Sequence, residues 1–412
     1  MKIKKFAEIL MIITFIAFLG AGMYFTLANR DAEYSYYENR NYAMMPEASV
    51  ETVLNGDYLD GIEDFLSDHS AFRENLVKIQ TYIDANILKR PVINDVVVTD
   101  EVLLPYKPYE IIDEEKIKNS AEKVASLNNE VKELVDSYGG EYVFTAVPCQ
   151  YACYEDAYPF YLNNREEYTD LSIKYLSEAM AKYGVNFIDM LPIFENSEDP
   201  VESARDEEGL FYSSRIDNHY DVRGGYLTYK AIVDLVNDKT DFNLKFPEGD
   251  EIIFTQYENP YRGSRTRKLL DVINFEEYIY RADFSEQLNL KMYSGIYEAT
   301  LRIYEEGIHL VDGMITYGYY MGGDKPQSKL STNRPELPSV LIYGDSYTNA
   351  VEVMAYYSFS EMHSLDLRHY KEMRLQDYIK EFEPDVVVCI RDYEALLTTV
   401  GNGDIGAIPD AA

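Results

Sequence analysis

Short apolar strands alternate with amphipathic helices over most of the chain after Asp113, and this alternation constrains the fold more than any other feature. Asp113 is suited to cap a helix, apolar positions then recur at helical spacing, and Gly139 and Gly140 stop the pattern. A run of strand-forming residues, 142–147, follows at once. Because strands buried on both faces are apolar throughout, the pattern predicts a mostly parallel sheet flanked by helices.

The same alternation continues towards the end of the chain. Further strands are predicted at 185–188, near 363–367, and at 340–343 and 386–390, with helices between them. Residues 240–335 are rich in tyrosine and lack clear periodicity, so they are interpreted as an insertion or lid. The expected α/β domain therefore covers 113–400 with this insertion, and the tail 401–412 is expected to be disordered.

The amino terminus carries a predicted membrane anchor. Lysines precede an uncharged apolar run at 9–28 (ILMIITFIAFLGAGMYFTLA), which is long enough to span a bilayer. The positive-inside rule then places the amino terminus in the cytoplasm and the rest of the chain outside. Thr26 and Ala28 form an acceptable cleavage site, so a removed signal peptide and a secreted protein is the alternative. Residues 1–30 are predicted as this anchor and 31–112 as a helical or irregular lead.

Charge and cysteine content exclude several classes of function. The net charge of −34 argues against nucleic-acid binding, which needs clustered Lys and Arg. Three cysteines are too few for a disulfide framework, although pairing of Cys149 with Cys153 stays open. The cysteines lack metal-ligand spacing and a nucleophile signature, so buried packing is their expected role. No metal and no cofactor is predicted.

Ser346 is the first candidate for chemistry. It lies in VLIYGDSYTNAVEVM, where a strand is followed by Gly344, Asp345 and Ser346 and then by a helix. This layout places a serine at the carboxyl end of a parallel strand, where ligands gather in open α/β sheets, and next to free N–H groups of a helix. The alternative is that Asp345 or Ser346 only caps that helix.

His219 is the candidate base for this serine. Of the five histidines, His219 is the best candidate, because Asp217 lies two residues earlier and can orient the imidazole if both residues sit on one loop. His69, which follows Asp68 on a predicted helix, is expected to make a surface or packing contact. A carboxylate on one ring nitrogen fixes the tautomer, so the other nitrogen can accept the serine proton. A plain loop before a helix, with an exposed histidine, is the alternative.

Several short segments together resemble the DHHW-motif family of exported bacterial proteins and, more distantly, the alginate O-acetyltransferases, which have an SGNH-hydrolase-like fold. The matching segments, in the family's order, are ENRNYAMMP (38–46), DHSAFR (68–73), LFYSSRIDNHYDVRGGYLTYKAI (210–232), GGDKPQS (322–328), VLIYGDSYTNA (340–350) and LDLRHY (365–370). The resemblance implies that Ser346 is a nucleophile, His219 its base and Asp217 the aspartate that orients the histidine.

The sequence departs from the family motif at two positions. DHHW reads Asp217-Asn218-His219-Tyr220, and the chain has no tryptophan. The smaller Tyr220 is expected to alter packing beneath the histidine loop.

Three further residues are candidate oxyanion or substrate-binding groups: Asn349, Arg368 and Tyr347. Helix capping by Asn349 and a charge pair for Arg368 are the alternatives.

The resemblance implies an extracytoplasmic O-acetyltransferase that acts on a cell-surface polysaccharide through an acyl-serine. A multi-pass membrane acyltransferase is the expected partner, because cytoplasmic acetyl donors cannot reach an exported site. A glycan acetylesterase with the same triad and an inactive glycan-binding or assembly protein are the alternatives. The sequence does not identify the glycan, the acyl donor, the fate of the anchor or the oligomeric state.

Overall fold

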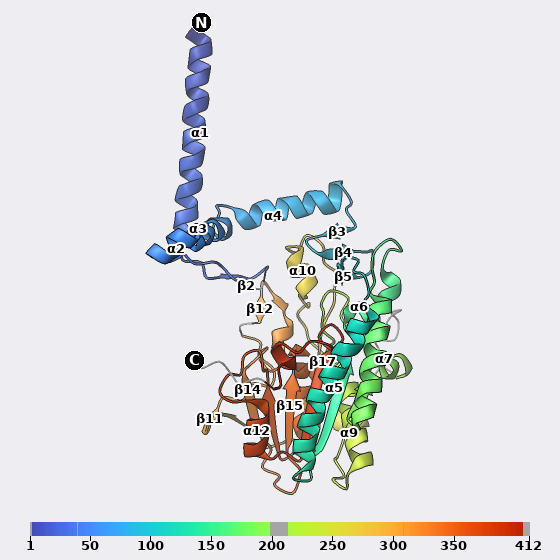
Figure 1. Cartoon of the computed structure of the whole chain (residues 1–412). Helices are drawn as coiled ribbons and strands as arrows, with labels where there is room; N and C mark the ends of the chain where they lie inside the picture. Colours follow the sequence, from blue (N-terminus) through green and yellow to red (C-terminus); the bar gives the residue numbers. More distant parts are fainter. Residues whose placement is uncertain (1, 39, 198–212, 308, 407–412) are drawn as a thin grey trace. The chain divides into compact units, whose positions relative to one another are not determined.

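The computed structural model describes residues 2–38, 40–197, 213–307 and 309–406. The chain divides into two compact units (Figure 1). The first comprises Met1–Asn94 with Thr266–Asn274, and the second comprises Asp95–Arg265 with Phe275–Ala412.

An eight-stranded sheet forms the centre of the second unit, in the order β11-β10-β14-β16-β15-β17-β6-β7. Its parallel strands are β6 (Glu141–Val147), β7 (Asn186–Asp189), β15 (Val340–Gly344), β16 (Glu361–Leu365) and β17 (Val386–Asp392). Strands β10 (Lys291–Ser294), β11 (Tyr297–Ala299) and β14 (Gln327–Ser331) extend it in antiparallel fashion. The expected α/β class with a mostly parallel sheet is confirmed.

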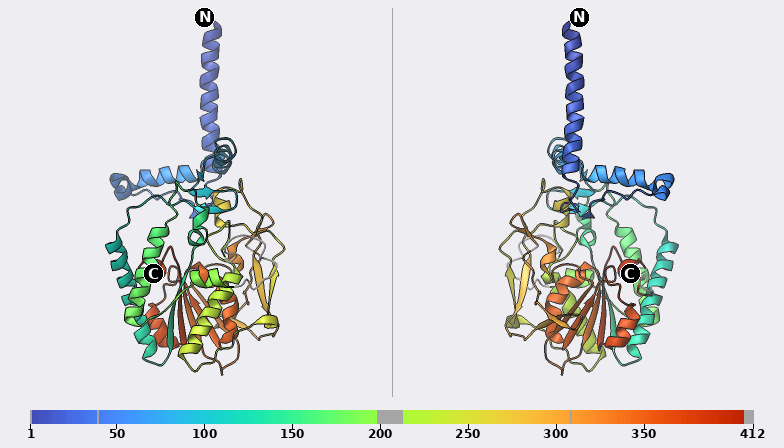
Figure 2. Two further views of the ribbon diagram at one scale, coloured as in Figure 1. Left: turned by 90° about the vertical axis from the view of Figure 1, so that its right-hand side faces the viewer. Right: turned by 90° about the vertical axis from the view of Figure 1, so that its left-hand side faces the viewer.

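Helices cover both faces of this sheet. Figure 2 shows α5 (Glu114–Asp136), α7 (Glu166–Tyr183) and α12 (Leu375–Phe382) on one face and α9 (Val222–Lys239) on the other. Helix α9 packs against α11 (Asn349–Ala355). The predicted signals at the helix ends are observed: the Asp113 side chain accepts the Lys116 N–H at 3.0 Å, and Gly184 ends α7 in the left-handed conformation.

Residues 240–335, interpreted from the sequence as an insertion or lid, contain several β-strands. They supply β10, β11 and β14 to the central sheet. They also form two two-stranded antiparallel sheets, β8 (Ile252–Gln256) with β9 (Tyr280–Phe284) and β12 (Leu310–Val311) with β13 (Met314–Ile315). Short antiparallel strands with one solvated face carry only a weak apolar pattern, which explains why they were not predicted.

Tyrosine supplies most of the largest side chains in the core of the second unit. Tyrosines make up ten of the twelve largest fully buried side chains of the chain. Buried hydroxyls need partners; for example, Tyr142 Oη donates to Asn128 Oδ1 at 2.6 Å and lies 2.7 Å from Tyr343 Oη. These tyrosines occupy core positions that other aromatic residues could fill, and they add a hydroxyl that needs a partner.

The tail expected to be disordered is ordered at its start. Gly401–Gly403 form a 3₁₀ turn, Asn402 and Ile405 are buried, and Asn402 Oδ1 accepts the Leu367 N–H at 2.6 Å. The expectation was wrong for 401–406 because one buried amide and one apolar side chain anchor an otherwise polar segment. Residues 407–412 lie outside the described part.

The first unit begins with the long helix α1 (Lys2–Ala28), whose apolar part is long enough to cross a membrane. Its remaining elements are β1 (Tyr34–Ser35), β2 (Arg40–Asn41), α2 (Val50–Asn55), α3 (Asp57–Asp68), α4 (Arg73–Tyr82), a π-helical turn (Ile83–Ile87) and β3 (Val92–Ile93).

Two of the family-like motifs bind each other inside this unit. The Asp68 carboxylate makes two hydrogen bonds with Arg40, at 2.5 and 2.8 Å, and Arg73 pairs with Glu38. The bond from Arg40 lowers the pKa of Asp68 to about 2 despite partial burial. His69 is fully buried and bonds the carbonyls of Phe65 and Ala32 at 3.0 Å each. ENRNYAMMP and DHSAFR therefore form a structural clasp, as expected for a packing role of His69.

We predict that Gly344→Ala destabilises the second unit by about 1–3 kcal/mol or more, since overpacking forces backbone shifts. A Cβ at this position would lie 2.0 Å from the Ile390 carbonyl oxygen of the neighbouring strand. Gly307→Ala is the control, because the nearest atom to its added Cβ is 3.6 Å away. Urea unfolding of both variants measures the difference; equal stabilities would contradict the predicted contact.

Candidate active site

Ser346 lies where the order of the sheet reverses. Strand β15 has the next strand along the chain, β16, on one side and the later β17 on the other. Such a switch point opens a crevice at the carboxyl ends of the strands. Gly344 ends β15, and its missing side chain lets the backbone pass close to Ile390 before the turn. The serine then begins the 3₁₀ turn Ser346–Thr348 that leads into α11.

His219 reaches Ser346 from a loop 127 residues earlier. Its Nε2 lies 2.6 Å from Ser346 Oγ, and its Nδ1 lies 3.3 Å from Asp217 Oδ2. Asp217 Oδ2 therefore accepts the Nδ1 proton and leaves Nε2 free to accept a proton from the serine. The three side chains that the sequence singled out are brought together, and their arrangement can activate a hydroxyl as a nucleophile.

Asp217 is buried, and every neighbour around it donates a hydrogen bond. Oδ1 accepts the backbone N–H groups of Asn218 and Ser264 at 2.8 and 3.1 Å, and Oδ2 accepts the Tyr261 hydroxyl. Burial alone would raise the pKa of this carboxyl. The charge on His219 and these side-chain bonds outweigh it and hold the pKa of Asp217 well below its ordinary value.

A second segment, which the sequence did not predict to be near the site, holds the histidine loop in place. Tyr261 and Ser264 belong to a stretch whose backbone bonds the loop, with Arg265 N–H donating to the Ile216 carbonyl at 3.0 Å. Gly263 permits this approach, because a Cβ there would lie 2.1 Å from the same carbonyl oxygen. The only available clue was a lone glycine in a region interpreted as an insertion.

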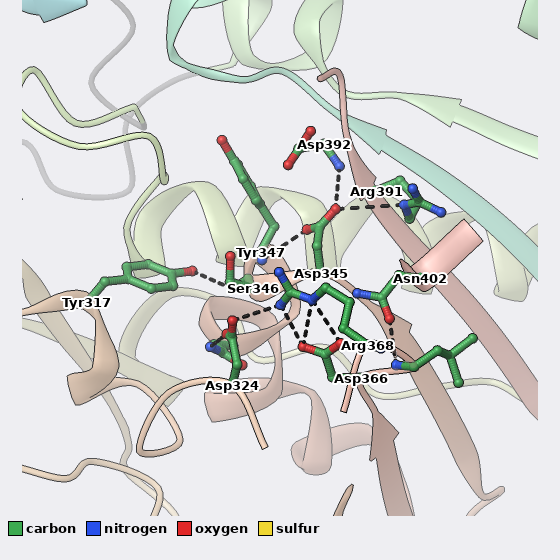
Figure 3. Close-up of polar contacts among 12 residues, drawn as sticks. Tyr317, Asp324, Asp345, Ser346, Tyr347, Asp366, Arg368, Arg391, Asp392 and Asn402 are labelled. Carbon is green, nitrogen blue, oxygen red and sulfur yellow. Dashed lines mark hydrogen bonds and ion pairs between the residues drawn. The ribbon is translucent and has the colours of Figure 1, made fainter. Parts of the chain in front are cut away.

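Tyr317 is a further site residue that the sequence reasoning missed. Its ring stacks on the His219 imidazole, with ring centres 3.8 Å apart and planes 4° from parallel. Its hydroxyl donates to the Ser346 carbonyl at 3.1 Å, as Figure 3 shows. Tyr317 thus restrains the ring and the serine together, and its π face can stabilise a positive charge on the imidazole.

Tyr220 and Tyr347 pack beneath the histidine loop. The Tyr220 hydroxyl donates to the Tyr347 carbonyl at 2.7 Å, and their rings lie 5.0 Å apart. The Tyr347 hydroxyl donates to the Asn218 carbonyl, and its ring lies 5.4 Å from that of His219. Tyr220 is buried in place of the tryptophan of DHHW and its hydroxyl has a partner. Tyr347 is buried as well, so its expected role in substrate binding stays a prediction.

Asn349 and Arg368 meet at Asp324. The Asn349 amide donates to Asp324 Oδ1 at 3.2 Å. Arg368 bonds Asp324 Oδ2 at 2.7 Å and also the Asp366 carboxylate (Figure 3). Asn349 retains a second amide N–H that can serve as an oxyanion donor. Arg368 makes the charge pair that the sequence left open, and no contact between it and Ser346 is found among the described residues.

Asp345 supports the turn from behind. One oxygen accepts the Tyr347 N–H at 3.2 Å, which confirms the capping role, and the other accepts the Asp392 N–H at 3.0 Å (Figure 3). Burial raises the pKa of Asp345, although Arg391 at 3.8 Å opposes the rise. Burial and the nearby Asp345 charge raise the pKa of Asp392 to about 8.

The remaining candidate side chains have structural roles or stand alone. His363 lies within β16 and stacks on Phe382 with ring centres 3.7 Å apart. Cys149, Cys153 and Cys389 are all free, so the pairing that the sequence left open does not form.

Asp324, Asp366 and His369 offer ligand atoms within 4.8 Å of one another, but Arg368 already neutralises both carboxylates. Leu210, Phe211 and Tyr212, the start of one motif, lie outside the described residues.

The fold of the chain is shared with solved structures of bacterial proteins. Bacillus cereus PatB1 with a sulfonyl adduct aligns with a TM-score of 0.57 and 18% identity, over 73% of this chain and 95% of that one. A DHHW family protein from Eubacterium siraeum aligns with a TM-score of 0.54 and 19% identity, over 77% and 97%. The O-acetyltransferase domain of Pseudomonas putida AlgJ aligns with a TM-score of 0.45 and 15% identity, over 74% of this chain and 92% of that one.

No protein-family model and no curated protein sequence matches the chain. The resemblance to DHHW-motif proteins that the sequence motifs indicated is confirmed by the shared fold.

We predict that Tyr261→Phe lowers stability in a pH-dependent way. The pKa of Asp217 is lower in the folded protein than in the unfolded chain. The Asp217 charge therefore adds to the free energy of unfolding above the unfolded pKa of about 3.9. This contribution is lost as the pH falls towards the folded pKa. Loss of the Tyr261 hydroxyl as a donor to Asp217 should lower the free energy of unfolding by about 1.5–3 kcal/mol at pH 7 and by less at pH 3.

The control is Tyr158→Phe, which removes a buried hydroxyl that bonds the neutral carbonyl of Pro105 at 2.8 Å. Its cost should be the same at both pH values. Urea unfolding at pH 7 and pH 3 compares the variants, and an equal loss for Tyr261→Phe at both would contradict a role in holding the Asp217 charge.

We predict that the Tyr317 ring matters more than its hydroxyl for the reactivity of Ser346. Tyr317→Leu removes the stacked face and should slow labelling of Ser346 by a sulfonyl fluoride roughly fivefold, about 1 kcal/mol of cation–π stabilisation. Tyr317→Phe keeps the ring and should label at near the parent rate. Labelling is followed by mass spectrometry of the intact protein; equal slowing in both variants would assign the effect to the hydroxyl.

Proposed function

We propose that the chain is an extracytoplasmic O-acyltransferase that moves acetyl onto a cell-surface polysaccharide through an acyl-serine. The single observation that supports this most is the continuous hydrogen-bond chain from Ser346 Oγ through His219 to the buried Asp217. We assign Ser346 as the nucleophile, His219 as the general base and acid, and Asp217 as the group that orients it.

Each step follows from the positions of the atoms. As Ser346 Oγ attacks the carbonyl carbon of the donor ester, its proton passes to His219 Nε2, 2.6 Å away. The imidazolium is stabilised by Asp217 and by the stacked face of Tyr317. It returns the proton to the leaving oxygen, which leaves an acyl-serine. A sugar hydroxyl then gives its proton to Nε2 and attacks the acyl carbon, and Ser346 Oγ recovers the proton.

Developing negative charge on the carbonyl oxygen needs donors near Ser346. We propose the second N–H of the Asn349 amide, whose first N–H is held by Asp324. Arg368 fixes Asp324 in turn, so it acts here as a positioning residue and not as a direct substrate ligand. Donors held in place before reaction cost little reorganisation when charge develops.

The fold and the amino terminus support the cellular setting of this proposal. We propose an SGNH-hydrolase-like arrangement in a DHHW-motif protein, supported by the fold shared with the Eubacterium siraeum protein. The sulfonyl adduct of the similarly folded PatB1 fits a site that carries a reactive nucleophile. Helix α1 would anchor the chain with its lysine-flanked end in the cytoplasm, and a multi-pass membrane acyltransferase would supply the acetyl group.

We predict that Ser346→Ala abolishes both acetate release and sugar acetylation, by on the order of a thousandfold or more. The purified full chain, in detergent, is incubated with an acetyl ester, with and without oligosaccharide, and both products are quantified. The control Ser137→Ala changes a serine exposed at the end of α5 and should behave like the parent.

The acceptor decides between transfer and hydrolysis. A transferase should acetylate the sugar and release less acetate when sugar is present, whereas acetate release that is unaffected by sugar would identify an esterase. Parent-level acetylation by Ser346→Ala would contradict the acyl-serine proposal altogether.

A further inference from the structure

A second concave site lies in the α/β unit, apart from the Ser346 cluster. A cavity of about 770 Å³ is lined by the segment 109–113, the first turns of α5 and α7, and the segment 394–398 that follows β17. We refer to it as the 109–398 groove. Its volume falls within the roughly 300–1,000 Å³ of small-molecule sites. None of Ser346, His219 and Asp217 lines it.

The groove and the nucleophile share one edge of the sheet. Strand β17 lies next to β15 and ends at Asp392, whose N–H donates to the Asp345 carboxylate, directly before Ser346. Only two residues further on, Glu394 lines the groove. The groove therefore opens at the same edge of the sheet as the reacting hydroxyl.

The lining suits a sugar. Tyr109 is 83% exposed and presents an uncovered ring, and the Tyr168 ring is held by the Arg165 guanidinium at 4.4 Å from its centre. Asn163 and Asn164 also line the groove. The Asn163 amide donates to the Pro108 carbonyl at 3.0 Å, and the amide oxygens of Asn163 and Asn164 accept the Arg165 and Glu166 N–H groups, so both side chains are held in the wall of the groove. A pyranose ring has apolar C–H faces that pack on aromatic rings and hydroxyls around its edge that bond amides.

The charge of the groove restricts which sugar can bind. Five carboxylates line it, of which Glu394 is paired with Lys107, against two lining cations, Lys116 and Arg165. The partial positive charge of the helix dipole at the amino terminus of α5 and of α7 is already compensated, because each helix carries two glutamates in its first turn. An anionic polymer would meet repulsion here, on a chain whose net charge is −34.

We propose that the 109–398 groove binds the acceptor glycan, and that this glycan is a chain of neutral or amino sugars without carboxylate, phosphate or sulfate groups. The assignment of the groove as an acceptor site rests on the proposed acyl transfer. Binding of the glycan does not depend on turnover.

Binding is tested first with the full-length Ser346→Ala protein in detergent, which cannot turn over. Short oligomers of glucosamine, N-acetylglucosamine and galacturonic acid are titrated by calorimetry at low salt. The first two should bind, glucosamine more tightly, and the galacturonic acid oligomer should not. Equal or tighter binding of the galacturonic acid oligomer would overturn the proposal.

Variants locate the binding site. Tyr109→Ala and Tyr168→Ala should each weaken binding of N-acetylglucosamine oligomers by roughly three- to tenfold. The control Tyr297→Ala removes an equally exposed tyrosine from β11 at the far edge of the sheet and should bind like the parent. Glu166→Gln with Glu167→Gln should weaken the glucosamine oligomer selectively. Circular dichroism verifies folding of each variant, and unchanged affinities in folded tyrosine variants would overturn the proposal.

Turnover separates this proposal from acyl transfer itself. In protein with Ser346 intact, Tyr109→Ala should raise the KM for the acceptor oligomer and leave hydrolysis of a small acetyl ester unchanged. If Tyr109→Ala acetylates the sugar with an unchanged KM for the acceptor, the groove is not the acceptor site, and the proposed acyl transfer is unaffected. Glycan binding without acetylation of any oligomer would overturn acyl transfer and leave a glycan-binding groove.

Discussion

Burial of the Asp217 charge is the constraint on which the site depends. A carboxylate removed from water is costly unless its oxygens are satisfied by donors. Here the donors come from the loop itself, from Ser264 and Tyr261 on a separate segment, and from His219. These hydrogen bonds to one carboxylate fix the loop that carries residues 217–219. The fixed loop places His219 within hydrogen-bond distance of Ser346. Tyr317 then restrains both from the other side.

The same principle explains the clasp at the end of the apolar helix. Asp68 gathers two bonds from Arg40 and one from the Ala43 N–H, so it joins two motifs 25 or more residues apart in sequence. The clasp also contacts α1, since the Ala71 N–H donates to the Thr26 hydroxyl at 3.2 Å and Phe72 packs on Phe25. Not every family-like motif therefore carries chemistry; these two order the chain where the helix ends.

Tyr220, at the position where the DHHW motif has tryptophan, packs beneath a site in which His219 still contacts both Ser346 and Asp217. Tyr220 replaces a tryptophan and uses its hydroxyl to hold the backbone of Tyr347, which in turn bonds the Asn218 carbonyl. A core in which tyrosine replaces other aromatics gains a hydrogen bond at many positions, but each buried hydroxyl then demands a partner. Such a core fixes backbone segments around Ser346 through side-chain hydroxyls.

The sequence alone determined the α/β alternation and the apolar amino-terminal helix, because periodicity is written into short stretches of chain. It nominated Ser346, His219 and Asp217 only through the resemblance of several short segments to the DHHW-motif family. It did not indicate that Tyr261, Ser264 and Tyr317 surround that trio, or that residues 240–335 extend the sheet. Those contacts join positions with no periodic relation, and short solvated strands leave a weak pattern. Only the tertiary structure decided them, because a buried charge selects its donors by their position in space and not by their place in the chain.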